Sequence, residues 1–530
     1  MSTPRLALIG LLLLPLPVLP ATASRTTSNN LVRIDSGPIH GATSGSIRSF
    51  KGIPYAAPPL GNLRWRAPQP VASWHEVRPA VDYGPDCMQK PIPGDAAASG
   101  GVFSEDCLFV NVWRPASRAR GNALPVLVWI HGGGFLNGGS STPLNDGSSL
   151  ARQGLVVVSF NYRLGRLGFF MHPALSAENP DASGNFGFLD QLAALQWVRR
   201  NIKVFGGDPG RVTIMGESAG GISVMHLLTW PAARGLFHRA VVMSGGGRTY
   251  LIADTGAAPV ARAQRAGMAF AESMGIDAAK GNVLAALRAL PVEKVNGDMS
   301  MEALLTKPAT YAGGPILDGR VVTRMPADAL RDGSFTKVPV LIGTTSDDLP
   351  VLFPPREDPL SVFGAEAPAA RAIYSAGAEN PVTMIKDIAV DRTMHEPARF
   401  VAKRVATSGL SAWIYRFGYT ADSLGTKPAG AEHSTELPYL FGTEIARYGA
   451  AATEKDRAAG RAFQDFIAAF AKHGDPNHAG ATRWPRFDAA EPGLMMFKAD
   501  ATAVFEPDPW QLRLDLVEHA SDTEAGKSTS

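Results

Sequence analysis

The stretch of sequence that most constrains the fold runs from Phe205 to Gly221 and reads FGGDPGRVTIMGESAGG. Its β-branched residues predict a short strand over Arg211–Met215, and the apolar residues Ile222–Leu228 predict a helix. Between them the turn Gly216–Gly220 leaves no room for a loop. Glycine is expected at both ends of this turn because a side chain there would collide with the neighbouring strand or helix.

The rest of the chain repeats the alternation of buried strands and helices. Near-continuous apolar runs, which a sheet covered on both faces requires, predict strands at Leu124–Ile130, Leu155–Tyr162, Arg211–Met215, Ala240–Ser244, Val338–Gly343 and Ser411–Phe417. A helix is predicted over Asp190–Ile202, where apolar residues recur at helical spacing. The pattern predicts an α/β fold with one large, mostly parallel sheet and helices on both faces.

Two longer helical stretches, 258–335 and 365–410, interrupt this alternation. They lie between the fourth and fifth and between the fifth and sixth predicted strands, and they are expected to form a cap over one end of the sheet. No internal repeat or low-complexity linker divides the chain, so residues 24–530 are expected to form a single domain. The polar tail 521–530 is expected to be disordered.

The N-terminus has the pattern of a secretory signal over residues 1–23. Arg5 precedes the apolar run Leu6–Leu19, and a small-x-small site follows at Ala21–Ala23. The run is short and interrupted by proline, so it predicts export, either periplasmic or extracellular and of bacterial type, rather than a membrane span. The two cysteines, Cys87 and Cys107, would then most simply form a disulfide, and two buried free thiols are the alternative.

The charge of the chain excludes some partners. The formal net charge is +3, from 51 basic and 48 acidic residues, and the basic residues are dispersed. A nucleic-acid surface or a polybasic membrane patch needs basic residues gathered together, so we expect neither, and no stable membrane anchor. The oligomeric state cannot be read from these features.

Ser218 is the candidate nucleophile, because a serine in a strand–turn–helix context of the form G-x-S-x-G is raised above the sheet beside a helix N-terminus. The pentapeptide alone is weak evidence in a chain with 55 glycines among 530 residues. A neutral serine also needs a base, a group that orients the base, and donors for an oxyanion.

Oxyanion donors are predicted at His131–Phe135, which reads HGGGF and directly follows a predicted strand. Three glycines leave backbone N–H groups unshielded at that point. The N–H groups of Gly133, Gly134 and Ala219 would together form a three-donor hole, whereas the plainer interpretation of the glycines is a flexible turn.

The base and the acid are expected to follow the serine along the chain, in the order nucleophile, acid, histidine. Among the histidines after Ser218, His433 lies in a loop soon after the last predicted strand, which is where such a fold presents its base. His226 is expected to be packed, and His395 to be structural or solvated. The strand Val338–Gly343 runs into Asp347 and Asp348, and either could orient the imidazole.

Seven separated motifs occur in order, and together they resemble the type-B carboxylesterase family, the cholinesterase-related branch of the α/β-hydrolases. The motifs are Phe50–Pro59, Leu63–Arg66, Glu105–Asn111, His131–Phe135, Asn161–Gly165, Gly184–Gln191 and the segment around Ser218. The resemblance implies a Ser218–His433–Asp348 triad, the three oxyanion donors named above, and a Cys87–Cys107 disulfide. It also implies that Glu217 and Ser244 support the triad residues without contacting the substrate themselves.

Two departures from the family pattern matter. The family usually has a glutamate followed by glycine at the acid position, but here Asp348 is followed by Leu349, so Asp347 stays open as the acid. The segment 88–106 contains no tryptophan to stack on a quaternary ammonium, which argues against choline esters.

The expected activity is hydrolysis of small-molecule carboxylic esters through an acyl-enzyme intermediate, with no metal or cofactor. An amidase or carbamate hydrolase with the same triad is the alternative among enzymes. A non-catalytic binding protein is the alternative outside them, although such relatives usually lose the serine or the histidine. The natural ester is not readable from the sequence.

Overall fold

The computed structural model describes residues 30–91, 99–117, 123–179, 184–248, 258–277, 281–297, 299–300, 310–349, 358–377, 380–424 and 428–528. The predicted signal segment 1–23 lies outside the described residues. Among those residues, no helix is both long and apolar enough to cross a membrane.

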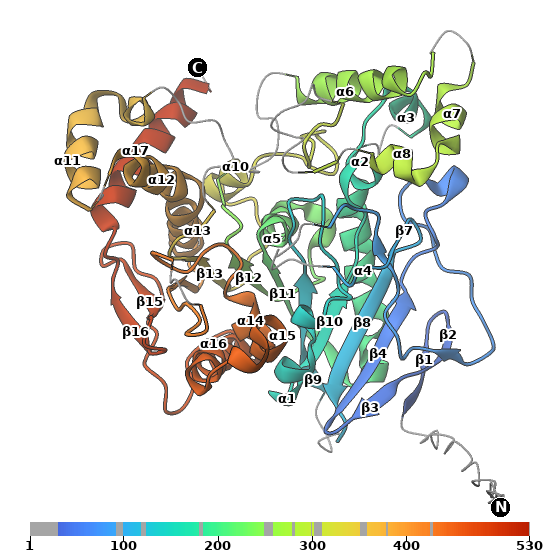
Figure 1. The fold of residues 1–530 in the computed structure, drawn as a ribbon, viewed down its shortest axis with the longest axis horizontal. Helices are drawn as coiled ribbons and strands as arrows, with labels where there is room; N and C mark the ends of the chain where they lie inside the picture. The colour runs from blue at the N-terminus through green and yellow to red at the C-terminus, as the bar shows by residue number, and fades with distance from the viewer. Residues whose placement is uncertain are drawn as a thin grey trace, which may run out of the picture.

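One large sheet forms the centre of the molecule (Figure 1). Its eleven strands are ordered β16–β15–β14–β13–β12–β11–β9–β10–β8–β4–β3. Their bounds are β3 (Ala42–Ser44), β4 (Ile47–Pro54), β8 (Phe109–Pro115), β9 (Leu124–Ile130), β10 (Val156–Phe160), β11 (Gly207–Glu217), β12 (Arg239–Met243), β13 (Val340–Thr345), β14 (Ala412–Phe417), β15 (Gly493–Phe497) and β16 (Ala503–Pro507). The six predicted strands form a contiguous parallel block from β14 to β10, as an α/β fold requires.

The remaining five strands were not predicted, and β8 shows why. Its sequence FVNVWRP is almost wholly buried, but Asn111 and Arg114 interrupt the apolar run. Asn111 is satisfied by tertiary contacts, since its Nδ2 donates to Ser140 Oγ at 3.0 Å and to Ser159 Oγ at 3.2 Å. Such contacts leave no signal in the local sequence.

Helices cover both faces of the sheet, and the alternation along β9 shows it. Val126, Val128 and Ile130 pack in one apolar cluster with α4 (Phe186–Asn201), α5 (Ala219–Thr229) and α13 (Glu396–Thr407). Leu127 and Trp129 pack in another with α1 (Ser148–Arg152), α14 (Leu437–Phe441) and α16 (Glu454–His473). Burial of every β9 side chain but the first accounts for its continuous apolar sequence.

The two predicted insertions are helical. The first contains α6 (Pro259–Ser273), α7 (Val283–Ala289), α8 (Val292–Asn296) and α10 (Pro326–Arg331), and the second contains η7 (Pro359–Glu366), α11 (Ala367–Gly377), α12 (Pro381–Val390), η8 (Asp391–His395) and α13. The expectation that the whole second insertion is a cap is wrong for α13, which packs directly against β13 and β14. Its apolar stripe, including Phe400 and Val405, belongs to the sheet's own core.

The C-terminal tail also differs from the expectation of disorder. Helix α17 (Gln511–Ser528) continues through residues 521–528 and lies beside α11 and α12 (Figure 1). Asp522 Oδ1 is 2.8 Å from Arg248 Nη1 and 3.4 Å from Arg331 Nη2, and Val517 is fully buried. Polar residues that look like a tail in the sequence are held by these ion pairs.

Candidate active site

Ser218 lies at the junction of β11 and α5. Its backbone has φ 56° and ψ −122°, a conformation that non-glycine residues rarely adopt and that costs about 1–3 kcal/mol. Two backbone hydrogen bonds stabilise this strained conformation: Ser218 N donates to Met243 O at 2.9 Å, and Ser218 O accepts from Ile222 N at 2.8 Å. The helix begins at Ala219, three residues earlier than predicted, so its free N–H end lies directly beside the serine.

The glycines around Ser218 are required by close backbone packing, as predicted. A Cβ on Gly216 would overlap the backbone of Gly220, and one on Gly220 would overlap the carbonyl oxygen of Ile130. Ile130 is the last residue of β9 and precedes the HGGGF loop. The turn around Ser218 and the predicted oxyanion loop are therefore in van der Waals contact.

The predicted oxyanion loop has a left-handed backbone at two glycines, with φ 95° at Gly133 and φ 61° at Gly134. Gly133 O accepts from Leu136 N at 2.9 Å and from Asn137 N at 3.0 Å, which closes the loop on itself. Among the hydrogen bonds of the described residues, none uses the N–H of Gly133, Gly134 or Ala219. These three groups are thus available to an oxygen atom of a ligand.

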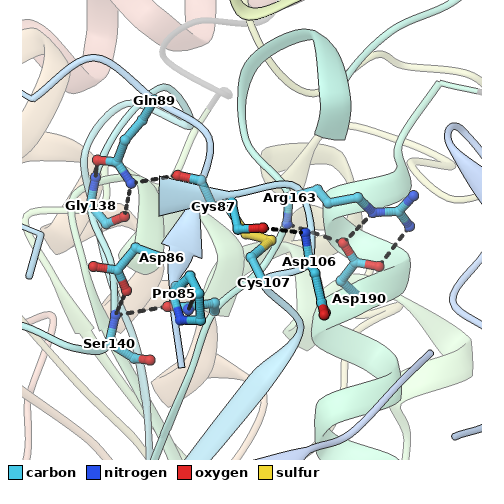
Figure 2. The surroundings of a disulfide bond; sticks show 12 residues. Pro85, Asp86, Cys87, Gln89, Asp106, Cys107, Gly138, Ser140, Arg163 and Asp190 are labelled. Atoms are coloured by element: carbon cyan, nitrogen blue, oxygen red, sulfur yellow. Dashed lines mark hydrogen bonds and ion pairs between the residues drawn. A yellow bond between two sulfur atoms is a disulfide. The ribbon is translucent and has the colours of Figure 1, made fainter. Parts of the chain in front are cut away.

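A disulfide supports the far end of this loop. Cys87 and Cys107 are joined by an S–S bond of 2.07 Å, and Figure 2 shows Gln89 reaching from that segment to Gly138. Gln89 Nε2 donates to Gly138 O at 2.7 Å and to Cys87 O at 2.9 Å, while Gly138 N donates to Gln89 Oε1 at 2.8 Å. The disulfide segment is thereby hydrogen-bonded to Gly138, three residues beyond the HGGGF loop.

Asp348 follows β13 and is fully buried. Its Oδ2 accepts from Ser244 Oγ at 2.6 Å and from Thr345 N at 3.0 Å, and its Oδ1 accepts from Leu349 N at 2.8 Å. Burial acts to raise its pKa, but the charge of His433 and these hydrogen bonds outweigh it and lower the pKa to about 2. The carboxylate is therefore ionised at neutral pH.

Asp347 is directed elsewhere. Its Oδ1 is 2.5 Å from Lys386 Nζ on α12, and its backbone N donates to Ala431 O at 2.9 Å. The structure brings Asp348, not Asp347, to the histidine. Of the two aspartates that the sequence left open, Asp348 is the one within hydrogen-bond distance of His433.

His433 is held between carboxyl groups. Its Nδ1 is 2.5 Å from Asp348 Oδ1, and its Nε2 is 3.2 Å from Oε1 of Glu217, the residue before Ser218. Burial acts to lower the pKa of His433, but the charges of Glu217, Asp348 and Glu436 outweigh it, so the pKa is raised. The imidazole lies beside the strained turn and is 19% exposed.

Glu436 is a member of this cluster that sequence analysis missed. It is fully buried, and neither carboxyl oxygen has a hydrogen-bond partner among the residues that the structure describes. Burial raises its pKa well above the ordinary value, and the negative charges of Glu217 and Asp348 raise it further. Its only sequence signal was its place three residues after His433, where it precedes the first turn of α14.

His226 and His395, the two other histidines considered as candidates, do not take part in the cluster around His433. His226 stacks on Phe188 at a centroid distance of 4.0 Å, and burial lowers its pKa to about 3, as fits the expected packed residue. His395 is buried and hydrogen-bonded to Asp391 and Thr345. Of the two expectations for His395, the structural one is right.

Comparisons with known proteins identify relatives across the chain. A family model described as the carboxylesterase family matches residues 28–358 and 371–511. A fumonisin B1 esterase of Sphingopyxis macrogoltabida is 36% identical over 489 residues, covering 88% of this chain and 86% of the relative. A para-nitrobenzyl esterase of Bacillus subtilis (strain 168) is 35% identical over 503 residues, covering 91% and 97%. A solved structure of a PNB esterase is 33% identical with a TM-score of 0.78, covering 92% and 99%, and the fold is the α/β-hydrolase fold.

Proposed function

The chain belongs to the carboxylesterase family and hydrolyses carboxylic esters, and from this premise we propose that hydrolysis proceeds through an acyl-enzyme intermediate on Ser218. The observation that carries the proposal is the 2.5 Å hydrogen bond between His433 and Asp348 beside the strained turn that bears the serine. An imidazole whose Nδ1–H is held by a carboxylate presents its other nitrogen as a base.

In the proposed first half-reaction, His433 Nε2 takes the proton of Ser218 as Oγ attacks the ester carbonyl carbon. The oxygen of that carbonyl becomes an oxyanion and accepts from the N–H groups of Gly133, Gly134 and Ala219. The imidazolium then returns its proton to the leaving alkoxide, and the alcohol departs. Asp348 keeps the imidazole in the required tautomer and stabilises its charge.

In the second half-reaction, His433 takes a proton from water as the water attacks the acyl carbon, and Ser218 leaves with that proton. Ser244 and Glu217 are assigned supporting roles. The Ser244 hydroxyl donates to Asp348, and the Glu217 carboxylate, 3.2 Å from His433 Nε2, stabilises the imidazolium that forms in each step.

The test is covalent labelling of the purified protein with a fluorophosphonate, followed by intact-mass analysis and peptide mapping. We expect one adduct, on Ser218, and none on unfolded protein. Ser218→Ala should remove the adduct and lower kcat on a p-nitrophenyl ester at least about ten-thousandfold, with unchanged circular dichroism. No adduct on folded protein, or an adduct on another residue, would overturn the assignment.

We further propose that the protein is exported after removal of residues 1–23. Two features support this: the charged, apolar and small-residue order of the N-terminus, and a Cys87–Cys107 pair of the kind that persists in oxidising compartments. Expression of the full chain in a bacterium should yield protein that begins near Ser24 outside the cytoplasm. Retention of Met1 in cytoplasmic protein would contradict the proposal.

A further inference from the structure

A second histidine–aspartate pair lies next to the segment that carries Asp348. The helical stretch from α12 to α13 widens into one π-helical turn at η8, where Glu396 N donates to Asp391 O. Pro397 follows, and it has no N–H to continue the regular α-helical pattern. The turn directs Asp391 and His395 toward the end of β13.

The His395 ring is buried, with both nitrogens hydrogen-bonded. Nδ1 is 2.9 Å from Asp391 Oδ1, and Nε2 is 3.1 Å from the backbone oxygen of Thr345. The ring packs on Trp510, which directly precedes α17, at a centroid distance of 4.6 Å, and the His395 side chain is 2% exposed.

Both partners of His395 can only accept. Asp391 Oδ2 already accepts from Tyr374 Oη at 2.8 Å and from Arg513 Nε at 2.7 Å. Burial acts to raise the pKa of Asp391, but the hydrogen bond from His395 and the charges of His395 and Arg513 lower it on balance, so the group is a carboxylate. A carbonyl oxygen cannot donate either, so in the hydrogen bond with Thr345 O the donor is Nε2–H of His395.

The contact with Thr345 leads directly to the acid. Thr345 is the last residue of β13, and its N–H donates to Asp348 Oδ2 at 3.0 Å. The peptide group that follows is held from two sides, because its oxygen accepts from His395 and its N–H, on Ser346, donates to Phe417 O at 2.8 Å. His395 thus anchors the strand end from which Asp348 is presented.

We propose that His395 is a positioning residue, which donates to the Thr345 carbonyl and so fixes the segment 345–348 in the conformation that places Asp348 against His433. The inference rests on the proposed role of Asp348 as the acid of the triad. Its consequence is that the geometry of the acid depends on a residue of the second insertion and, through Asp391 and Arg513, on the C-terminal helix.

Two substitutions separate the two hydrogen bonds of the ring. In His395→Gln the side-chain amide reaches the position of Nε2 and retains a donor to Thr345 O. In His395→Asn the amide reaches only the position of Nδ1, so that donor is lost. We expect the Gln variant to keep kcat within about twofold and the Asn variant to lose between about tenfold and a hundredfold in kcat, with KM little changed.

A spectroscopic readout accompanies the kinetics. The short bond between His433 Nδ1–H and Asp348 should give a far-downfield proton resonance, absent in His433→Ala and Asp348→Asn. We expect this resonance to persist in the Gln variant and to shift or broaden in the Asn variant. His226→Phe is the matched control, because it removes another buried imidazole and should leave the resonance in place.

Equal kcat and an unmoved resonance in the two His395 variants would overturn the inference. A measurement on wild-type protein serves if the Asn variant does not fold. Nitrogen-15 spectra of labelled histidine should show a proton on Nε2 of His395, and an unprotonated Nε2 would overturn the inference. Failure of Ser218 to label in wild-type protein is a separate outcome, which refutes the proposed function instead.

Discussion

The two halves of the active site are built in different ways. The half that holds Ser218 and the glycine loop is shaped by backbone: a strained turn, left-handed glycines and a contact between Gly220 and Ile130 too close for a side chain. The half that holds Asp348 and His433 is shaped by side chains, which meet across 85 residues of sequence. Contiguous sequence motifs therefore specify the half of the site that holds Ser218, whereas the half that holds Asp348 and His433 forms only in the complete tertiary structure.

The largest expected effect tests the side-chain half. Asp348→Asn keeps the shape of the acid but removes the charge that holds the His433 tautomer, so kcat should fall about ten-thousandfold. Asp347→Asn is the matched control, because Asp347 is the neighbouring carboxylate but pairs with Lys386 of α12 instead of His433, so the substitution should change kcat less than about threefold. Steady-state kinetics on one p-nitrophenyl ester compares them. Equal losses, or the reverse order, would mean that the acid has been misidentified.

A smaller effect is expected from the backbone half. In Gly220→Ala the added methyl group overlaps the carbonyl of Ile130 and pushes α5 away from the glycine loop. The donor on Ala219 would then separate from those on Gly133 and Gly134, so kcat should fall about a hundredfold. The free energy of unfolding should decrease by about 1–3 kcal/mol.

Gly210→Ala, on β11, the strand that leads into the Ser218 turn, is the control for this substitution. A Cβ there meets only the side chain of Asp208, at 3.2 Å, and the position is exposed. Both kcat and the denaturation midpoint should stay close to wild type. If Gly220→Ala behaved like this control, close packing between α5 and β9 would not be what aligns the donors.

The same division explains how much could be predicted. The parallel block of the sheet was readable because burial on both faces gives β9 to β14 continuous apolar sequences. The strands β3, β4 and β16 were not, since they are partly exposed or carry polar residues. Strand β15 was also missed, although its sequence GLMMF is apolar and largely buried. Ser218 and the glycine loop were predicted as site candidates from local motifs.

The acid–base half was only partly readable. The choice of Asp348 over Asp347 needed the family resemblance, because two adjacent carboxylates after one strand have no local feature that separates them. The sequence did not single out Glu436 or His395. Glu436 interacts electrostatically with Glu217, and His395 is hydrogen-bonded to Thr345, and both of these partners are distant in sequence. The helical end of α17 was missed because the arginines that hold Asp522 lie in other elements.

The smallest effect is expected from Glu436→Gln, which changes the charge beside His433 and leaves the shape of the site nearly the same. Ester hydrolysis requires neutral His433, whose fraction increases as pH rises through its pKa, so the acidic limb of kcat/KM against pH reports that pKa. Negative charge on Glu436 raises the pKa of His433. Burial and the charges of Glu217 and Asp348 raise the pKa of Glu436 itself, so only part of the protein carries this charge while His433 titrates. Glu436→Gln should therefore move the limb to lower pH while leaving the plateau within about twofold.

Glu444→Gln is the matched control for Glu436→Gln. Glu444 is another buried glutamate, and its pKa is raised to about 7, chiefly by burial. It is not among the groups that shift the pKa of His433. The acidic limb of kcat/KM against pH for Glu444→Gln should coincide with that of the wild type. Glu217→Gln should move the limb further than Glu436→Gln, since Glu217 Oε1 is 3.2 Å from the imidazole. If Glu436→Gln left the limb in place, Glu436 would be protonated throughout the working range, and the carboxylates that tune the base would be Glu217 and Asp348 alone.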